Sequence, residues 1–298
     1  MEKRQFGKTD MQTSVLGFGG AEIGYGEAPA DQVRSLLNSA LDAGLNVIDT
    51  AECYMGSEEL IGQAVSGRRK EFYLFTKCGH PTNSYSNPDW SPGSIEMSID
   101  RSLKRLKTDY LDLIQLHSCT EEVLRQGDVI TALQRARDAG KARYIGYSGD
   151  GQAALYAIES GAFDTLQTSV SIADQEAIDL TLPLASKKGM GVITKRPIAN
   201  VAWKYTESPD PYYVPYWERF KVLNYEYLKG DMTSAVDTAL RFTLSVPGVH
   251  TMIVGTTQPD RWQKNASIIA AGKLPADKYE AIRARWKAVA KQDWVGQV

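Results

Sequence analysis

Four side chains that can exchange protons lie at or just after the ends of short apolar runs. Asp49 ends one run, Lys77 and His117 follow two others, and Tyr54 comes five residues after Asp49. A phenol beside an ammonium can give its proton to an oxygen that gains negative charge, because the ammonium stabilises the phenolate. We therefore expect Lys77 to lower the pKa of Tyr54. The carboxylate can keep the lysine charged, and the imidazole can orient the oxygen. These residue types predict a site that protonates a carbonyl oxygen as hydride arrives.

Each of the four residues also has an ordinary structural interpretation. Asp49 could cap a helix, Lys77 could be solvated, His117 could be a hydrogen-bonded core histidine, and Tyr54 could pack within a loop. Their matching places at strand ends favour a shared function over four independent structural roles.

Metal and thiol chemistry are the rival interpretations. We expect no metal site, because short ligand spacing is missing among the histidines, which are His80, His117 and His250. The three cysteines follow or flank the strand-end residues, so they could form a redox-sensitive cluster or simply fill space at the rim: Cys53, Cys78 and Cys119.

A repeated helix–strand pattern surrounds these residues. After Asp31, a possible helix cap, apolar residues recur at helical spacing, and glycines precede the next strands at 44, 67, 140, 161 and 189. The apolar runs are short, as strands covered on both faces should be. We expect eight strands, at 15–16, 47–49, 72–76, 111–116, 143–147, 165–167, 192–194 and 251–254.

Eight such units predict an α/β protein with a (β/α)8 TIM barrel, in which strand ends converge on one rim. Residues 4–5 and 13–15 predict an N-terminal β-hairpin, and long connections at 79–92 and 197–231 exceed what a barrel needs, as does a helical pattern at 259–270. We expect one domain over residues 1–298. The alternative is a doubly wound sheet, but the run Gly17-Phe18-Gly19-Gly20 lacks the third glycine of a dinucleotide fingerprint.

The composition argues against a nucleic-acid-binding, membrane or secreted protein. The 298 residues are 43% hydrophobic and carry a net charge of −2, which gives no general attraction to nucleic acid or an anionic membrane. No apolar run is long enough to span a bilayer, and the start of the chain is too polar for a secretory signal. The odd number of cysteines favours a reducing compartment. We therefore expect a cytoplasmic protein.

Two motifs resemble those of the aldo-keto reductases. Residues 49–58 read Asp-Thr-Ala-Glu-Cys-Tyr-Met-Gly-Ser-Glu, and residues 102–106 and 109–113 with His117 are similar to a second motif of that family. The resemblance implies a barrel that reduces aldehydes or ketones with NADPH. By that resemblance Tyr54 is the general acid, Lys77 and Asp49 tune it, and His117 positions the carbonyl.

The same resemblance implies residues that hold the nicotinamide end of the cofactor. Ser148 and Gln167 match the positions that bind its carboxamide, while Gly149 stands where the family usually has asparagine. Lys195 stands where many members stack a tyrosine, so it could reach the pyrophosphate instead. The residues that follow it belong to the same predicted contact: Arg196, Pro197 and Ile198.

The adenosine end is expected at residues 255–265. Gly255, Thr256 and Thr257, with Arg261 and Asn265, are similar to the family's adenosine-phosphate segment, and Lys264 could add affinity for phosphate. A guanidinium suits bidentate binding of a 2′-phosphate, which favours NADP, although Arg261 could also be an ordinary surface arginine. NAD stays possible, because Gly255 replaces a lysine that many members have. We also expect the cofactor to contact Gly19 and Gly20.

The substrate is expected to be a small-molecule carbonyl compound. Ala21, His80, Trp203 and Trp217 are the predicted contacts, with an apolar pocket shaped by the loop at 79–92 and the aromatic segment at 197–231, and without a long C-terminal lid. Such a pocket suits an apolar or aromatic carbonyl, or a sugar stacked on a tryptophan. The alternative function is a nucleotide-binding barrel with little turnover that serves as a regulatory or structural subunit. The sequence leaves the oligomeric state unknown.

Overall fold

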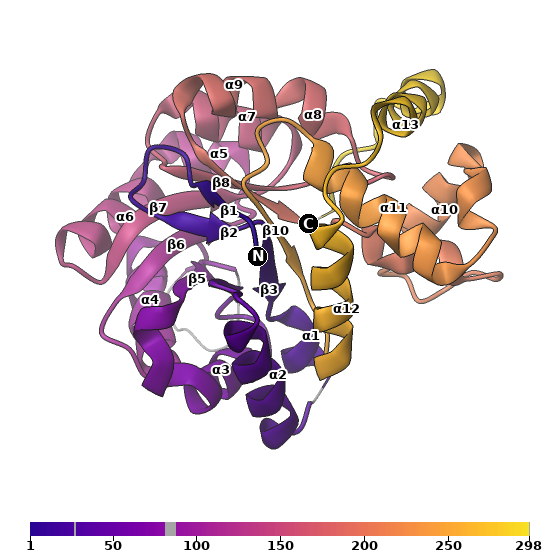
Figure 1. The fold of residues 1–298 in the computed structure, drawn as a ribbon. Helices are drawn as coiled ribbons and strands as arrows, with labels where there is room; N and C mark the ends of the chain where they lie inside the picture. Colours follow the sequence, from indigo (N-terminus) through magenta and orange to yellow (C-terminus); the bar gives the residue numbers. More distant parts are fainter. Residues whose placement is uncertain (27, 81–87, 298) are drawn as a thin grey trace.

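The computed structural model describes residues 1–26, 28–80 and 88–297. Within them, eight parallel strands close into a barrel in the order β10-β3-β4-β5-β6-β7-β8-β9, with helices around the outside (Figure 1). The strands are β3 (Leu16–Gly19), β4 (Val47–Asp49), β5 (Tyr73–Cys78), β6 (Leu111–His117), β7 (Ala142–Ser148), β8 (Thr165–Ser169), β9 (Gly191–Lys195) and β10 (Thr251–Val254). The predicted barrel is confirmed. The doubly wound alternative is wrong, because β10 pairs with both β3 and β9 and closes the sheet.

The predicted N-terminal hairpin is also present. β1 (Lys3–Gln5) pairs antiparallel with β2 (Gln12–Ser14). Phe6 and Met11, in the connection between these two strands, lie in a buried cluster with one residue from each of four barrel strands: Val47, Phe75, Leu113 and Ile193. The Phe6 and Phe75 rings stack with their centroids 5.7 Å apart. The barrel interior is therefore a packed core at this level, as small parallel barrels require.

The helices form because their apolar residues share one face. In α2 (Ala30–Asp42) the buried residues recur at the predicted spacing: Val33, Leu36, Leu37, Ala40 and Leu41. The other helices are α1 (Ala21–Tyr25), α3 (Ser57–Val65), α4 (Pro92–Leu106), α5 (Glu121–Gln126), α6 (Asp128–Asp138), α7 (Gly151–Ser160), α8 (Glu176–Leu180), α9 (Leu182–Lys188), α10 (Val214–Leu223), α11 (Met232–Ser245), α12 (Pro259–Ala270) and α13 (Ala276–Val289). Across the described ranges, every helix is too short or too polar to span a lipid bilayer.

Two of the predicted helix boundaries are wrong. Asp31 is not a cap, because α2 begins one residue earlier and has Pro29 at its N-cap. Gly67 does not end α3 in a left-handed turn, because the chain continues into the 3₁₀ helix η1 (Ser66–Glu71). The other helix-ending glycines do have positive φ, at 44, 140, 161 and 189.

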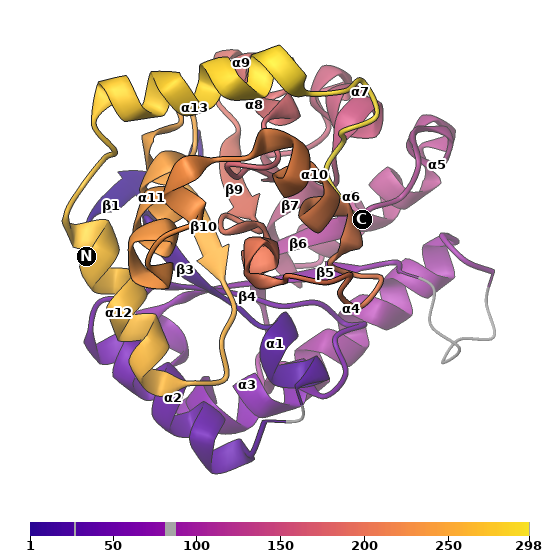
Figure 2. The ribbon, with the colours of Figure 1, turned by 90° about the vertical axis from the view of Figure 1, so that its right-hand side faces the viewer.

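The long segment after β9 is largely helical. It contains the 3₁₀ helices η2 (Ala199–Lys204) and η3 (Glu226–Leu228) on either side of α10. The chain that follows α13 returns to the same side, where the carbonyl of Val295 accepts a hydrogen bond of 2.6 Å from Arg219 of α10. Figure 2 shows the C-terminal end beside α10. Of the predicted substrate loop at 79–92, residues 81–87 lie outside the described residues.

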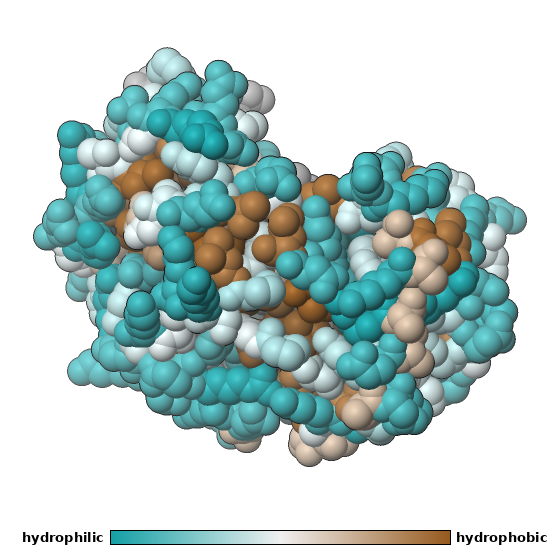
Figure 3. Space-filling view, turned by 90° about the horizontal axis from the view of Figure 1, so that it is seen from above, coloured by the Kyte–Doolittle hydropathy of each residue, from teal (hydrophilic) through white to brown (hydrophobic). Residues whose placement is uncertain are grey.

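One face of the molecule, drawn in Figure 3, is mainly polar around its edge. Figure 3 shows one face of the molecule, where hydrophobic side chains gather toward the middle and hydrophilic ones surround them. The polar surroundings follow from the helix pattern, since the apolar side of each amphipathic helix packs on the barrel.

Candidate active site

The side chains at the rim continue the layer of residues that fills the barrel. Successive side chains of a strand alternate between its two faces, so a residue two positions beyond an interior residue also points inward. Asp49 lies two residues after the interior Val47, Lys77 two after Phe75, and Lys195 two after Ile193. The apolar core is thus followed, toward the carboxyl ends of the strands, by a layer of charged and polar groups.

Lys77 and Asp49 form a buried ion pair in this layer. The Nζ atom of Lys77 lies 2.5 Å from Oδ1 of Asp49, and the two side chains are only 1% and 2% exposed. Nζ also donates a hydrogen bond of 2.9 Å to the carbonyl of Thr50. The burial of Lys77 by itself would lower its pKa, but the Asp49 carboxylate outweighs that effect and the pKa is raised. The lysine is therefore held as an ammonium.

Two amides complete the surroundings of the Asp49 carboxylate. Its Oδ2 atom accepts hydrogen bonds from Nε2 of Gln167, at 2.9 Å, and from Nε2 of Gln115, at 3.3 Å. Gln115 is not among the residues predicted from the sequence. Its position two residues after Leu113 and two before His117 was the signal that could have identified it, because these three share one face of β6.

Tyr54 and His117 lie beside the ion pair. The Nζ atom of Lys77 is 5.0 Å from the centroid of the Tyr54 ring. The Tyr54 ring meets the His117 ring edge to face, with centroids 5.7 Å apart. The structure thus brings together the four residues that the sequence singled out.

The pKa of Tyr54 is raised, whereas a neighbouring ammonium alone would lower it. Burial raises this pKa, Lys77 opposes the rise, and the Asp49 carboxylate adds to it, so that the net change is upward. The expectation of a lowered pKa from the sequence is wrong because it considered the ammonium and left out burial, which is the largest cause of the rise. At neutral pH the Tyr54 phenol therefore keeps its proton.

The His117 imidazole is neutral. Burial and the nearby cations Lys77, Lys195 and Arg196 hold the pKa of His117 well below 6.5. The ring of His80, an exposed residue, lies 5.3 Å from that of His117. A neutral imidazole can donate one hydrogen bond without bringing a further positive charge to the rim.

A second buried ion pair lies on the other side of the rim. The Nζ atom of Lys195 is 2.9 Å from Oδ2 of Asp150, whose Oδ1 accepts hydrogen bonds of 2.7 Å from Thr168 Oγ1 and from the backbone N–H of Ser169. Burial lowers the pKa of Lys195. Asp150 is another residue that sequence reasoning missed, because it lies in a loop outside the matched motif.

The next residue, Arg196, is held by the C-terminal segment. Its Nη1 atom donates a hydrogen bond of 2.6 Å to the carbonyl of Gln297, and Lys195 donates a weaker one of 3.3 Å to the same oxygen. Pro197 is buried and Ile198 is half-buried at the start of η2. This side of the rim is thus crossed by a short C-terminal segment, a contact that the sequence did not indicate.

The predicted carboxamide contacts lie next to each other. The Ser148 hydroxyl donates a hydrogen bond of 3.2 Å to Oε1 of Gln167, and the backbone N–H of Gly149 donates one of 3.0 Å to the Gln167 carbonyl. The amide nitrogen of Gln167 is engaged by Asp49, as described above. The pair therefore offers a hydroxyl and an amide oxygen at one point of the rim.

The glycine positions near β3 and β10 keep the backbones close. A side-chain carbon on Gly20 would lie 2.7 Å from Ser57 Oγ, and one on Gly255 would lie 2.5 Å from Glu22 Cγ. One on Gly19 would find ordinary contact distances, the nearest 3.4 Å from the Gly255 nitrogen. At Gly20 and Gly255 the space that a side chain would need is thus already filled by other residues of the protein.

The segment predicted to bind adenosine phosphate lies at the start of α12. Arg261 is exposed, whereas Asn265 and Thr256 are buried. Thr257 is half-buried, and its carbonyl accepts a hydrogen bond from Gln32. Lys264 forms an ion pair of 2.8 Å with Asp260. Its charge is thus already paired with a carboxylate, which weakens the expectation that it adds affinity for phosphate.

The aromatic segment packs largely on itself. The Trp203 ring meets Phe220 edge to face at 5.3 Å, and Nε1 of Trp217 donates a hydrogen bond of 3.0 Å to the Tyr205 carbonyl. Both tryptophans are half-buried against the main core. Their contribution to a substrate pocket stays a prediction.

A tyrosine that sequence reasoning missed lies closer to the proton donor. The ring of Tyr25 in α1 lies 5.8 Å from that of Tyr54, and its hydroxyl donates a hydrogen bond of 3.3 Å to the Cys53 carbonyl. Ala21, a half-buried residue, is four positions earlier in the same short helix. The spacing of four residues from Ala21 could have indicated that Tyr25 also faces the rim.

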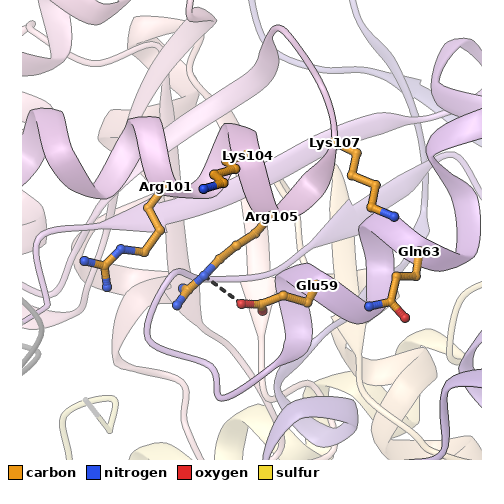
Figure 4. A pocket seen from close by; sticks show the side chains of 6 residues that line it. All are labelled: Glu59, Gln63, Arg101, Lys104, Arg105 and Lys107. Atoms are coloured by element: carbon orange, nitrogen blue, oxygen red, sulfur yellow. Dashed lines mark ion pairs between the residues drawn. The ribbon is translucent and has the colours of Figure 1, made fainter.

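The loop that carries Tyr54 is braced from the outside by α4. Arg105 donates a hydrogen bond of 3.1 Å to the Glu52 carbonyl. It also forms an ion pair of 2.7 Å with Glu59 of α3 (Figure 4). Behind them, Glu58 accepts a hydrogen bond of 2.8 Å from Thr76, and burial raises the pKa of Glu58 to about 7. A surface hollow of about 350 Å³ beside this brace is lined by Glu59, Gln63, Arg101, Lys104, Arg105 and Lys107.

The buried ion pair gives a prediction about stability. In Lys77→Met the Asp49 carboxylate stays buried without its cation, so we expect the free energy of unfolding to fall by about 3–5 kcal/mol. The double variant Asp49→Asn, Lys77→Met removes both charges and should recover most of that loss. Urea denaturation followed by circular dichroism measures all three proteins.

Lys141→Met is the matched control. Lys141 pairs with Asp100 at the surface, where the side chains are 36% and 58% exposed, so its removal should cost less than about 1 kcal/mol. Equal losses in Lys77→Met and Lys141→Met would contradict the assignment of a buried, mutually dependent pair.

Comparison with known proteins agrees with this geometry. The model of the aldo/keto reductase family matches residues 15–287. The holo form of aldo-keto reductase AKR11C1 from Bacillus halodurans is similar over 99% of both chains, with a TM-score of 0.81 and 27% identity.

Two curated relatives are similar over most of their length. L-galactose dehydrogenase from Arabidopsis thaliana is 28% identical over 90% of this chain and 88% of its own. The uncharacterized oxidoreductase YqkF from Bacillus subtilis is 26% identical over 96% of this chain and 97% of its own. With the family match spanning all eight barrel strands, the chain belongs to the aldo/keto reductase family of oxidoreductases.

Proposed function

We propose that this protein reduces aldehydes or ketones to alcohols with NADPH, and that Tyr54 is the general acid. The observation that carries the proposal is the buried Lys77–Asp49 pair, 2.5 Å apart, with Lys77 Nζ 5.0 Å from the centroid of the Tyr54 ring. A structural ion pair needs no phenol and no imidazole beside it. Their presence at the carboxyl ends of barrel strands, where barrel enzymes carry their active sites, supports catalysis.

In this proposal Tyr54 donates its proton to the carbonyl oxygen as that oxygen gains negative charge. Its raised pKa ensures that the proton is present, and an alkoxide is a stronger base than a phenolate, so the transfer is favourable. The Lys77 ammonium stabilises the phenolate that forms, and Asp49 keeps Lys77 charged and in place. The neutral His117 donates a hydrogen bond that orients the carbonyl.

Members of this family use NAD(P)H, and the residues present fit such a cofactor. The Ser148 hydroxyl and the Gln167 amide oxygen could hold a carboxamide, since both are buried at the rim and bonded to each other. Contacts of Gly19 and Gly20, at the end of β3, and of Gly255, which follows β10, with the cofactor are part of this proposal. A bound reduced nicotinamide would supply the hydride.

The preference for NADPH rests on Arg261. Its guanidinium is exposed in the first turn of α12 and could bind a 2′-phosphate in a bidentate manner. Lys195 and Arg196 are further cations on the rim, although Asp150 neutralises Lys195 in this structure.

We further propose that residues 1–298 form one domain, because β3 near the start of the chain pairs with β10 near its end. The proposed substrate is a small apolar or aromatic carbonyl compound or, by analogy with the L-galactose dehydrogenase relative, a sugar-like one. The protein is proposed to act in the cytoplasm without nucleic-acid or membrane partners.

The proton donor is tested with Tyr54→Phe. That variant keeps the ring and removes only the hydroxyl, so kcat/KM for 4-nitrobenzaldehyde should fall by about 100-fold or more, measured as loss of NADPH absorbance. Tyr73→Phe is the matched control, since it removes a phenol hydroxyl at the start of β5, at the other end of that strand from Lys77, and it should stay close to the wild type.

Wild-type turnover by Tyr54→Phe would show that another group is the acid. A wild-type protein that binds NADPH but reduces no member of a panel of aldehydes and ketones would instead favour the regulatory or structural role.

Cofactor preference is tested with Arg261→Ala. A charge-assisted contact to the 2′-phosphate is worth roughly 1.5–3 kcal/mol, so Kd for NADPH should rise by about 10-fold or more while Kd for NADH stays unchanged. Quenching of tryptophan fluorescence during titration with each cofactor provides the two values. Lys287→Ala, which removes an exposed cation from α13, is the control. Equal effects on both cofactors would contradict a role for Arg261 in binding the 2′-phosphate.

A further inference from the structure

Cys53 makes a contact that the proposed mechanism does not use. Its sulfur lies 3.4 Å from Nδ1 of His117, within hydrogen-bonding distance for sulfur. Cys53 directly precedes Tyr54, and the hydrogen bond from Tyr25 to its carbonyl anchors its backbone. A side chain that precedes the proton donor in the chain and contacts the orienting imidazole can influence both.

The contact matters because His117 is neutral. A neutral imidazole has one nitrogen that carries a proton and one that accepts a hydrogen bond, so two tautomers compete. The tautomer with the proton on Nε2 can donate from Nε2, whereas the other presents a lone pair there. A lone pair would repel the oxygen of a carbonyl group that reached this nitrogen.

The chemistry of the two partners decides between the tautomers. Burial raises the pKa of Cys53 to about 11, so the thiol keeps its proton at neutral pH. An unprotonated imidazole nitrogen is a good acceptor, while a thiol sulfur is a weak one. The hydrogen bond therefore runs from the Cys53 S–H to Nδ1.

The other described neighbours of the ring act on it in different ways. Tyr54 and His80 contact His117 through their rings, at centroid distances of 5.7 and 5.3 Å. The cations Lys77, Lys195 and Arg196 act on the charge of the ring and disfavour the imidazolium. These cations keep the imidazole neutral, and the hydrogen bond with Cys53 acts directly on Nδ1.

We infer that Cys53 is a positioning residue, whose thiol donates to Nδ1 of His117 and so places the ring proton on Nε2. The consequence of this tautomer, that a carbonyl oxygen meets an N–H, rests on the proposed function. The tautomer itself is a property of the cofactor-free protein and does not depend on that function.

The tautomer can be measured directly by NMR. The chain has three histidines, so protein labelled with ¹⁵N at histidine gives few ring signals, and His117→Asn assigns those of His117. In the wild type at neutral pH we expect the ¹⁵N shifts of the Nε2–H tautomer. Cys53→Ala should move them toward Nδ1–H or a mixture, and Cys53→Ser, which restores a donor, should move them back.

Kinetics with 4-nitrobenzaldehyde and NADPH provide the second readout. Loss of one neutral hydrogen bond should lower kcat of Cys53→Ala by about fivefold, and Cys53→Ser should recover most of it. Kd for NADPH should not change in either variant. Cys119→Ala is the matched control, because it removes a different thiol, a buried one, whereas the thiol that contacts Nδ1 of His117 among the described residues is that of Cys53.

An Nδ1–H tautomer in the wild type would overturn the inference without any variant, and so would an unchanged Nε2–H tautomer in Cys53→Ala. Circular dichroism shows whether each variant is folded. If Cys53→Ala is not folded, the NMR spectrum of the wild type alone decides between the two tautomers. A wild type without reductase activity would refute the proposed function and leave the tautomer result standing, so the two failures can be told apart.

Discussion

The ion pair between Lys77 and Asp49 is the interaction on which the rest of the rim depends. Both side chains are almost completely buried, and two charges taken out of water are costly unless they pair closely and their remaining hydrogen-bonding groups are satisfied. The structure meets this condition with the Thr50 carbonyl on one side and two glutamine amides on the other. The result is a fixed positive charge beside Tyr54 in a place where water cannot screen it.

The barrel supplies what that ion pair needs. Parallel strands place residues of similar register next to each other, and Lys77 pairs in register with Gln115 of the neighbouring strand. The apolar layer below, with Phe6 and Phe75, excludes water from beneath the charges. The brace by Arg105 and the packing of α1 then hold the Tyr54 loop over the pair. The ion pair therefore depends on the core beneath it, and the phenol depends on the ion pair.

The parts that could be predicted from sequence are those set by local patterns. The eight strands follow from short apolar runs, and Asp49, Lys77 and His117 stand at their ends. What could not be predicted depends on contacts between distant segments. Asp150 lies in a loop, and Gln297 comes about one hundred residues after Lys195, so no local pattern connects them. The direction of the Tyr54 pKa shift was missed because it depends on the balance between burial, an ammonium and a carboxylate.

The ionisation of Tyr54 tests the central claim most directly, namely that the phenol stays protonated while Lys77 stands ready to stabilise its anion. Ultraviolet difference titration of the wild type against Tyr54→Phe isolates this one phenol. It should titrate above the ordinary pKa of 10.0, and higher still in Lys77→Met, where the ammonium no longer favours the phenolate. A titration below 10.0, or one that Lys77→Met leaves unchanged, would contradict the account.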